Sequence, residues 1–256
     1  MPNGHFDLFD AIRVEILEHF NKISSEIYLS KDDRIALTKL ARSDRKKFAP
    51  SKVMSRFKSR QSINFLLENG YLMLERSREQ KPMPKRKNEK LPKELRRYIV
   101  HDKVQFKSNY MRFWFRFIEP NLALLRQGDI TSVLDIIKAD FDNYASLAFE
   151  NLSISMVKKW LNMPNLEIYS YWTKEFEIDI YAQTKQGEFI LGEVKYKERK
   201  MCKNTLNALK KKAEKMGIDP KFILLISKSG FSQELFTLKG EKLKLFDLES
   251  FKTFFE

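Results

Sequence analysis

The stretch "EIDIYAQTKQGEFILGEVKY", residues 177–196, decides the fold of this chain. Its strand-forming residues predict two β-strands, and Gly187 lies at the turn between them. Residues two apart in a strand share a face, so Glu193 and Lys195 point the same way. If the two strands pair as a hairpin, Asp179 on the first strand lies beside Glu193. The pattern therefore predicts two acids and a lysine at one place on a sheet.

These residue types point to metal-dependent chemistry. Two hard carboxylates suit Mg²⁺, which binds through one or two carboxylates together with water and substrate phosphate. An adjacent ammonium group can orient the attacking water or offset charge in a phosphoryl-transfer transition state. The alternative for Lys195 is that it only solubilises an edge strand. If the assumed strand register is wrong by two residues, Glu177 or Lys197 would be the member of the site instead.

Glu150 is a further candidate for the same site. It is the only charged residue between Asp142 and Lys158, in an otherwise apolar and small-polar segment. Burying a carboxylate without a partner costs several kcal/mol. Glu150 is therefore expected to meet a metal site or a lysine, or else to be exposed.

The segments around the opening stretch predict a mixed α/β sheet. They alternate in the order helix, three strands, helix and strand, which is an αβββαβ arrangement. The predicted ranges are 140–161, 166–173, 176–183, 188–196, 203–217 and 221–227. The remaining C-terminal residues predict a short helix, a strand and a terminal helix.

The N-terminal part predicts a winged helix-turn-helix. Three helices are expected at 6–22, 32–42 and 51–69, with Gly70 as the C-cap of the third. Two strands, 71–75 and 96–106, follow with a long basic loop between them. The third helix can enter a major groove while the ribbon contacts the DNA backbone. The apolar stripe of that helix is expected to comprise Val53, Met54, Phe57, Ile63, Leu66 and Leu67, with Lys52, Arg56, Ser59 and Arg60 projecting elsewhere.

Charge supports this interpretation. The chain carries a formal net charge of +14, and residues 1–139 hold 29 Lys and Arg against 17 Asp and Glu, a net of +12. Two stretches, 42–60 and 76–97, contain most of the excess, as expected of a nucleic-acid-binding protein. A solvated basic face is the alternative, and an anionic membrane surface fits the helix-turn pattern less well. The expected DNA-binding residues are Lys52, Arg56, Lys58, Arg60, Lys85, Arg86 and Lys87.

Composition excludes several other classes. No apolar run approaches the length of a membrane span, and the N-terminus lacks the apolar region of a signal peptide. Cys202 is the only cysteine and the three histidines are scattered, which argues against an intrachain disulfide, a thiolate zinc site or a Ser/His/Asp triad. We expect a cytoplasmic protein that is not in a membrane. The aromatic segment 109–125 favours a core helix over a surface for stacked bases.

The chain resembles the PD-(D/E)XK nuclease superfamily in its motif order. Glu150 stands on the first helix, Asp179 on the second strand and Glu193-Val194-Lys195 on the third. More narrowly, the segments "FWFRFIEPN", "EIDIYA", "GEVKYK" and "ISKSGFSQEL" resemble the C-terminal region of archaeal-type P-loop ATPases, in which a winged helix precedes a nuclease-like domain. This resemblance covers roughly residues 30–250.

The resemblance implies roles for individual residues. Asp179, Glu193 and the Val194 carbonyl would bind Mg²⁺ or Mn²⁺, Lys195 would support the nucleophile, and Glu150 would serve a second metal or orient water. Two features depart from the pattern. Ile178 stands where the motif name has proline, and no Walker A sequence is present, so a separate protein would have to supply any ATPase activity.

We therefore expect three parts: a winged helix-turn-helix (1–108), an aromatic helical connector (109–139) and a restriction-endonuclease-like domain (140–256). The expected function is divalent-metal-dependent hydrolysis of DNA. A double-strand cut would need two active sites, which a homodimer would supply. The alternative is a DNA-binding regulator or partner protein whose nuclease fold is catalytically silent.

Overall fold

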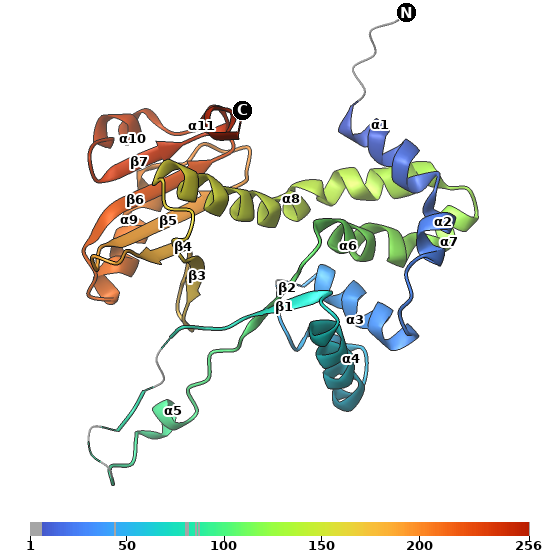
Figure 1. Ribbon diagram of the computed structural model, residues 1–256, viewed down its shortest axis with the longest axis horizontal. Coiled ribbons are helices and arrows are strands. Elements are labelled where there is room, and N and C mark those ends of the chain that lie inside the picture. The colour runs from blue at the N-terminus through green and yellow to red at the C-terminus, as the bar shows by residue number, and fades with distance from the viewer. Residues whose placement is uncertain (1–6, 44, 80–81, 85, 87, 256) are drawn as a thin grey trace, which may run out of the picture. The chain divides into compact units, whose positions relative to one another are not determined.

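The computed structural model describes residues 7–255 apart from 44, 80, 81, 85 and 87, and the chain forms two compact units (Figure 1). The first unit comprises Met1–Arg76 and His101–Phe141, and the second comprises Ser77–Val100 and Asp142–Glu256. The long helix α8 (Ile130–Trp160) begins in the first and ends in the second.

The first unit is mainly helical, and a two-stranded ribbon completes it. Strands β1 (Leu72–Glu75) and β2 (Lys103–Phe106) pair antiparallel. Besides the start of α8, the helices and helical turns of this unit are α1 (Leu8–Ile12), η1 (Arg13–Leu17), α2 (Phe20–Ser25), α3 (Lys31–Ala41), η2 (Ala49–Lys52), α4 (Arg56–Glu68), α6 (Asn109–Phe113), η3 (Trp114–Ile118), η4 (Glu119–Asn121) and α7 (Leu122–Arg126). The expected order of three helices and a β-ribbon is confirmed.

The aromatic segment 109–125 supplies the core of this unit. Trp114, Phe115 and Phe117 are almost completely buried, and α3 packs against η3. Burying side chains of this size contributes much of the apolar stabilisation of a small unit. The core interpretation of these rings is confirmed, and their burial excludes base stacking on them.

The third helix differs from its prediction. It begins at Arg56 instead of residue 51, because the Ser55 side chain caps it by accepting a hydrogen bond from the Lys58 amide, 3.3 Å away. The buried residues of the helix are Ser59, Ser62, Ile63 and Leu66. Val53, which precedes the helix, and Phe57 are exposed, and Ser59 is buried, contrary to expectation. At the other end Gly70 has φ +76, a left-handed conformation that favours glycine after a helix.

The segment between the ribbon strands belongs to the second unit, whereas the sequence interpretation placed it within the first domain. Arg78 forms an ion pair with Glu167, and its guanidinium carbon lies 3.5 Å from the centroid of the Tyr169 ring. Tyr98 donates a hydrogen bond to Glu79, and the Lys174 ammonium lies over the Tyr98 ring. The predicted strand 96–106 is longer than the observed one. Arg96 ends the short helix α5 (Lys93–Arg96), residues 97–102 form neither helix nor strand, and β2 starts at Lys103.

The second unit is built on a five-stranded mixed sheet of order β3-β4-β5-β6-β7. Its first three strands are antiparallel, and β6 and β7 run parallel to β5. The elements are β3 (Ile168–Trp172), β4 (Glu177–Gln183), β5 (Phe189–Lys195), α9 (Lys203–Lys215), β6 (Pro220–Ser227), α10 (Gln233–Leu238), β7 (Leu243–Phe246) and α11 (Leu248–Phe255). With α8 in front, this is the expected αβββαβ order, and the mixed α/β class is confirmed.

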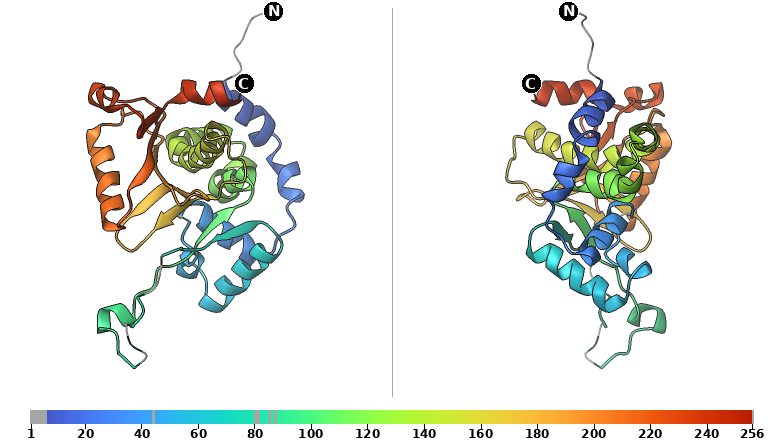
Figure 2. Two further views of the ribbon diagram at one scale, coloured as in Figure 1. Left: turned by 60° about the vertical axis from the view of Figure 1, so that its left-hand side comes forward. Right: turned by 90° about the vertical axis from the view of Figure 1, so that its right-hand side faces the viewer.

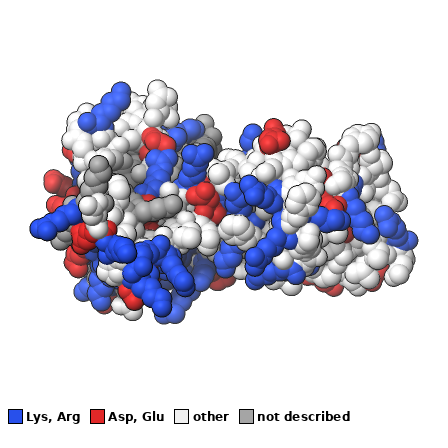
Figure 3. Space-filling model, turned by 90° about the horizontal axis from the view of Figure 1, so that it is seen from below, with Lys and Arg blue, Asp and Glu red and all other residues white. Residues whose placement is uncertain are grey.

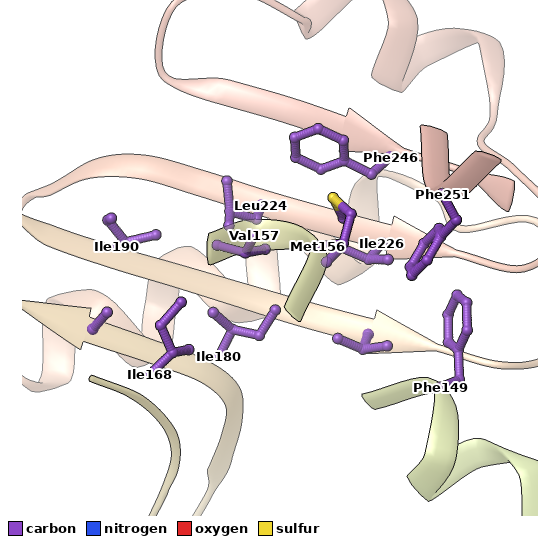
Figure 4. Packing of buried hydrophobic residues seen from close by; sticks show 12 residues of the cluster. Phe149, Met156, Val157, Ile168, Ile180, Ile190, Leu224, Ile226, Phe246 and Phe251 are labelled. Carbon is purple, nitrogen blue, oxygen red and sulfur yellow. The ribbon is translucent and has the colours of Figure 1, made fainter. Parts of the chain in front are cut away.

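Helices cover both faces of the sheet (Figure 2). Helices α8 and α11 pack on one face, where Phe149, Met156 and Val157 meet Ile180 and other strand residues in an apolar core (Figure 4). Helices α9 and α10 pack on the opposite face around Leu191, Leu206, Leu225 and Leu235. Within the described residues no helix has the length and apolar character that crossing a membrane requires.

Gly192 gives a direct test of this packing. A Cβ atom at Gly192 would lie 3.0 Å from the Ile180 Cβ and 3.2 Å from the Leu224 Cβ, because three strands approach closely there. Gly192→Ala should therefore lower the free energy of unfolding by about 1–3 kcal/mol in a urea titration. Gly240→Ala is the matched control, since its Cβ would have no atom within 4 Å, and it should be nearly neutral. Equal stability of the two variants would contradict the close strand packing.

Candidate active site

The site begins where the β4–β5 ladder stops. In the strand register Ile180 pairs with Gly192, and continuing that register by one step places Asp179 opposite Glu193. The Asp179 carboxylate accepts a hydrogen bond from the Val194 amide at 2.8 Å. Because a side chain and not a backbone carbonyl accepts this amide proton, the hydrogen bond fixes the Asp179 carboxylate against β5. The sequence prediction that Asp179 lies beside Glu193 is consistent with this register.

Lys195 joins the two carboxylates. Its Nζ atom lies 2.5 Å from Glu193 Oε1 and 3.9 Å from Asp179 Oδ2. The side chains of Asp179 and Glu193 are 14% and 12% exposed, while that of Lys195 is 37% exposed. The two carboxylate side chains are therefore sheltered, and the Lys195 side chain is more exposed than either of them.

Lys212 is a member of the cluster that the sequence interpretation missed. Its Nζ atom lies 2.8 Å from Glu193 Oε2 and donates to the Glu177 carbonyl oxygen at 2.6 Å. Lys212 belongs to α9, three residues after buried Leu209 and next to buried Ala213. This spacing places the aliphatic part of the lysine side chain at the border of the buried helix face. The same spacing, read from the sequence, could have indicated that Lys212 is partly buried and needs an acidic partner.

Burial and charge together set the protonation of the site. Burial, with the nearby charge of Glu193, raises the pKa of Asp179 to about 6, although Lys195 and the Val194 amide oppose this. Burial also acts to raise the pKa of Glu193, but Lys195 and Lys212 outweigh it and hold that pKa below its ordinary value. Burial acts to lower the pKa of Lys195, but the acids Glu193 and Asp179 raise it overall, so the lysine stays protonated.

Glu150 lies on α8, half-buried, and its charge is among those that raise the pKa of Lys195. This places its carboxylate within electrostatic reach of the cluster. Asp179 and Glu193 are the carboxylates adjacent to Lys195. Glu150 is therefore placed at the margin of the site.

The oxygen donors fit a hard divalent cation. Asp179 and Glu193 bring two carboxylates to one place, and Mg²⁺ uses one or two carboxylates when water and phosphate complete its coordination. Both oxygens of Glu193 contact ammonium groups, so a cation bound by this carboxylate would have to displace at least one lysine. Among the described residues, no three or more His, Cys, Asp or Glu side chains form a group that could hold a metal. Ligation by the Val194 carbonyl stays a prediction.

The expected DNA-binding residues fall in two groups. Lys52, Arg56, Lys58 and Arg60 are all exposed, on η2 and α4, and Lys58 is paired with Asp32 at 2.9 Å. Arg86 is exposed in the segment that belongs to the second unit. Lys85 and Lys87 lie outside the described residues. Figure 3 shows one face of the molecule, on which Lys and Arg side chains gather in groups.

Comparison with known protein families matches the middle part of the chain. Residues 114–214 match the DUF234 family model, described as archaea bacterial proteins of unknown function. The match includes Glu150, Asp179, Glu193, Lys195 and Lys212.

An uncharacterized protein of Methanocaldococcus jannaschii, MJECL04, is 33% identical to the chain over 160 residues, which is 57% of this chain and 34% of that protein. The chain thus spans about a third of the length of this relative. No solved structure gives a significant match.

The raised pKa of Asp179 predicts a pH-dependent stability. A carboxyl group with a pKa of about 6 in the folded chain and an ordinary value of 3.8 binds its proton more tightly when folded. The stability that it contributes is complete below pH 4 and is lost as the pH rises through 6. Asp179→Asn keeps an oxygen acceptor for the Val194 amide and removes this titration.

Without divalent metal, Asp179→Asn should therefore be more stable than the wild type at pH 7.5, by on the order of 1–3 kcal/mol. The difference should shrink as the pH is lowered towards 4, measured by urea unfolding at each pH. A variant that is less stable at every pH would contradict the electrostatics described for the cluster.

Proposed function

We propose that the chain is a Mg²⁺- or Mn²⁺-dependent deoxyribonuclease of the PD-(D/E)XK type. The observation that carries the proposal is the arrangement of Asp179, Glu193 and Lys195 on adjacent strands of an αβββαβ unit. Two carboxylates and an ammonium group at one sheltered place suit hydrolysis of a phosphodiester bond. The resemblance in motif order supports the same reaction.

Each residue has a role in this proposal. Asp179 and Glu193 would hold the cation, which when bound would offset phosphate charge and lower the pKa of a water molecule. Lys195 is protonated, so it acts as a hydrogen-bond donor to the phosphate or to the attacking water and not as a general base. Lys212 holds Glu193 in position through its second oxygen. Glu150 orients water or serves a second metal.

DNA would be held by the exposed basic face of α4. Arg56 and Arg60 are one helical turn apart, so their side chains lie on one side of the helix, with exposed Phe57 beside them. Guanidinium groups on a helix that follows a turn suit both phosphate and base-edge contacts in a major groove. A homodimer would supply the two active sites of a double-strand cut, and a separate ATPase is a proposed partner.

A second candidate function is a DNA-binding protein with a catalytically silent nuclease fold. The observation that favours it is the ion pairing of Glu193, whose two oxygens both contact lysines. If those pairs persist in solution at millimolar Mg²⁺, the carboxylate cannot serve as a metal ligand. Cleavage distinguishes the two candidates, since both bind DNA.

The cleavage experiment uses supercoiled and branched DNA with Mg²⁺ or Mn²⁺. The wild type should cut, and EDTA or replacement of Mg²⁺ by Ca²⁺ should largely stop it. Asp179→Ala and Glu193→Ala should abolish cleavage because each removes a hard oxygen ligand. Lys195→Ala should slow it on the order of a hundredfold, the usual cost of losing one preorganised charge. Asp219→Ala is the control, since this acid is 91% exposed, and it should cut normally.

If the wild type shows no metal-dependent activity on duplex, branched or single-stranded DNA or on RNA, the second candidate function, a catalytically silent nuclease fold, is favoured.

The binding experiment measures DNA affinity as a function of salt. Arg56→Ala/Arg60→Ala should weaken binding and reduce the magnitude of the log-log salt slope by roughly two, because two phosphate contacts are lost. Arg126→Ala/Lys138→Ala removes two exposed charges of the same unit away from α4 and is the matched control. Equal salt slopes for the two double variants would contradict the proposal that α4 contacts DNA.

A further inference from the structure

A pocket of about 570 Å³ lies on the outer face of α3, in the first unit. It is lined by one side of the helix, since its α3 residues recur three or four positions apart. Residues from two neighbouring segments close it. The lining residues are Lys31, Arg34, Ile35, Thr38, Lys39, Arg42, Val53 and Glu119.

The floor of the pocket is a neutral, fixed ion pair. Arg34 donates to both oxygens of Glu119 at 2.8 and 2.9 Å, and to the carbonyl oxygens of Ser24 and Ile27. Glu119 also accepts from the Trp114 indole at 2.9 Å. This network satisfies both partners, so Glu119 has little capacity left to neutralise other cations in the pocket.

The remaining charge in the pocket is positive. Lys31, Lys39 and Arg42 line it, and no acid in the described part of the chain forms an ion pair with any of them. Glu119 is the one acid in the lining, and Arg34 already pairs with it. Three cations around one concave surface favour an anion of more than one charge.

Arg42 is oriented by its own hydrogen bond. Its Nε atom donates to the Arg116 carbonyl oxygen at 3.2 Å. Arg116 is itself held by Asp140 and by the Ala41 carbonyl oxygen. Within the described part of the chain, neither terminal nitrogen of Arg42 has a hydrogen-bond partner, and the two have the fork geometry that matches a phosphate group.

The rest of the lining suits an organic phosphate. Ile35 and Val53 supply apolar surface, and Val53 is 54% exposed although its position on a predicted apolar stripe led us to expect burial. The Thr38 hydroxyl donates to the Arg34 carbonyl oxygen, which leaves its oxygen as an acceptor. The volume lies within the range of small-molecule sites and is large enough for a mononucleotide.

We propose that this α3 pocket binds a phosphate ester, with Lys31, Lys39 and Arg42 contacting the phosphate. The ligand is either a free nucleotide or a phosphate of the DNA backbone, which present the same chemistry. The pocket is separate from the Asp179 cluster and stands whether or not the chain cleaves DNA. Only the backbone source rests on the proposed function.

The test titrates the full chain with ATP, with inorganic pyrophosphate and with labelled duplex DNA, using calorimetry for the first two and fluorescence anisotropy for the third. The pocket variant is Lys39→Ala/Arg42→Gln, and Arg126→Ala/Lys138→Ala is the charge-matched control. A free-nucleotide site predicts saturable ATP binding that weakens at least tenfold in the pocket variant and is unchanged in the control. Thermal unfolding of each variant confirms that it is folded.

A backbone site predicts no ATP binding, a DNA affinity that falls about tenfold more in the pocket variant than in the control, and a salt slope reduced by roughly two. If the pocket variant matches the control for all three probes, the proposal is overturned. Cleavage by the pocket variant is measured at saturating DNA, where the pocket, being separate from the Asp179 cluster, should not limit the reaction. Metal-dependent cleavage by the wild type, with binding by the pocket variant equal to that of the control, would overturn the pocket proposal alone. No cleavage by the wild type, with weakened binding by the pocket variant, would overturn the nuclease proposal alone.

Discussion

The hydrogen bond from the Val194 amide to the Asp179 carboxylate is the constraint on which the site depends. It replaces a rung of the β4–β5 ladder by a side chain and so holds an acid in a place that burial disfavours. Burial and the neighbouring charge of Glu193 together raise the pKa of Asp179 to about 6. Lys195 opposes this shift, and Lys195 and Lys212 pair with the Glu193 carboxylate. The protonation of each group in the cluster therefore depends on the charges of the others.

The packed sheet keeps these charges in register. Apolar residues fill both faces, and Gly192 lets β4, β5 and β6 approach closely beside Glu193. A side chain in place of Gly192 would push on Ile180, the residue after Asp179. The geometry of the site and the stability of the sheet thus depend on the same strands, and polar chemistry is confined to the end of the β4–β5 pair.

Much of the fold could be predicted because its signals are local. Strand alternation gave β4 and β5, and with them the same-face placement of Glu193 and Lys195. The break before α4 was harder to predict, since Ser55 competes with an otherwise continuous helical pattern. Val53 precedes the helix and Phe57 lies on its exposed side, so both were wrongly assigned to the apolar stripe. Apolar spacing alone could not show which residue caps the helix.

The features that could not be predicted from the sequence depend on contacts between residues far apart in the chain. Lys212 reaches Glu193 only because α9 crosses the sheet, and Arg78 contacts Glu167 across 89 positions of the sequence. A charge count cannot distinguish such lysines and arginines from solvated ones. The α3 pocket has the same origin, because Arg34 and Glu119 are 85 residues apart. These pairings need the folded chain.

The most direct test of the central claim is anomalous diffraction from crystals grown with Mn²⁺. The account predicts one strong peak about 2 Å from carboxylate oxygens of both Asp179 and Glu193, with Lys195 moved off Glu193. The peak should be absent from Asp179→Asn crystals grown in the same way. No peak at saturating Mn²⁺, with both lysines still paired to Glu193, would contradict a metal-dependent active site.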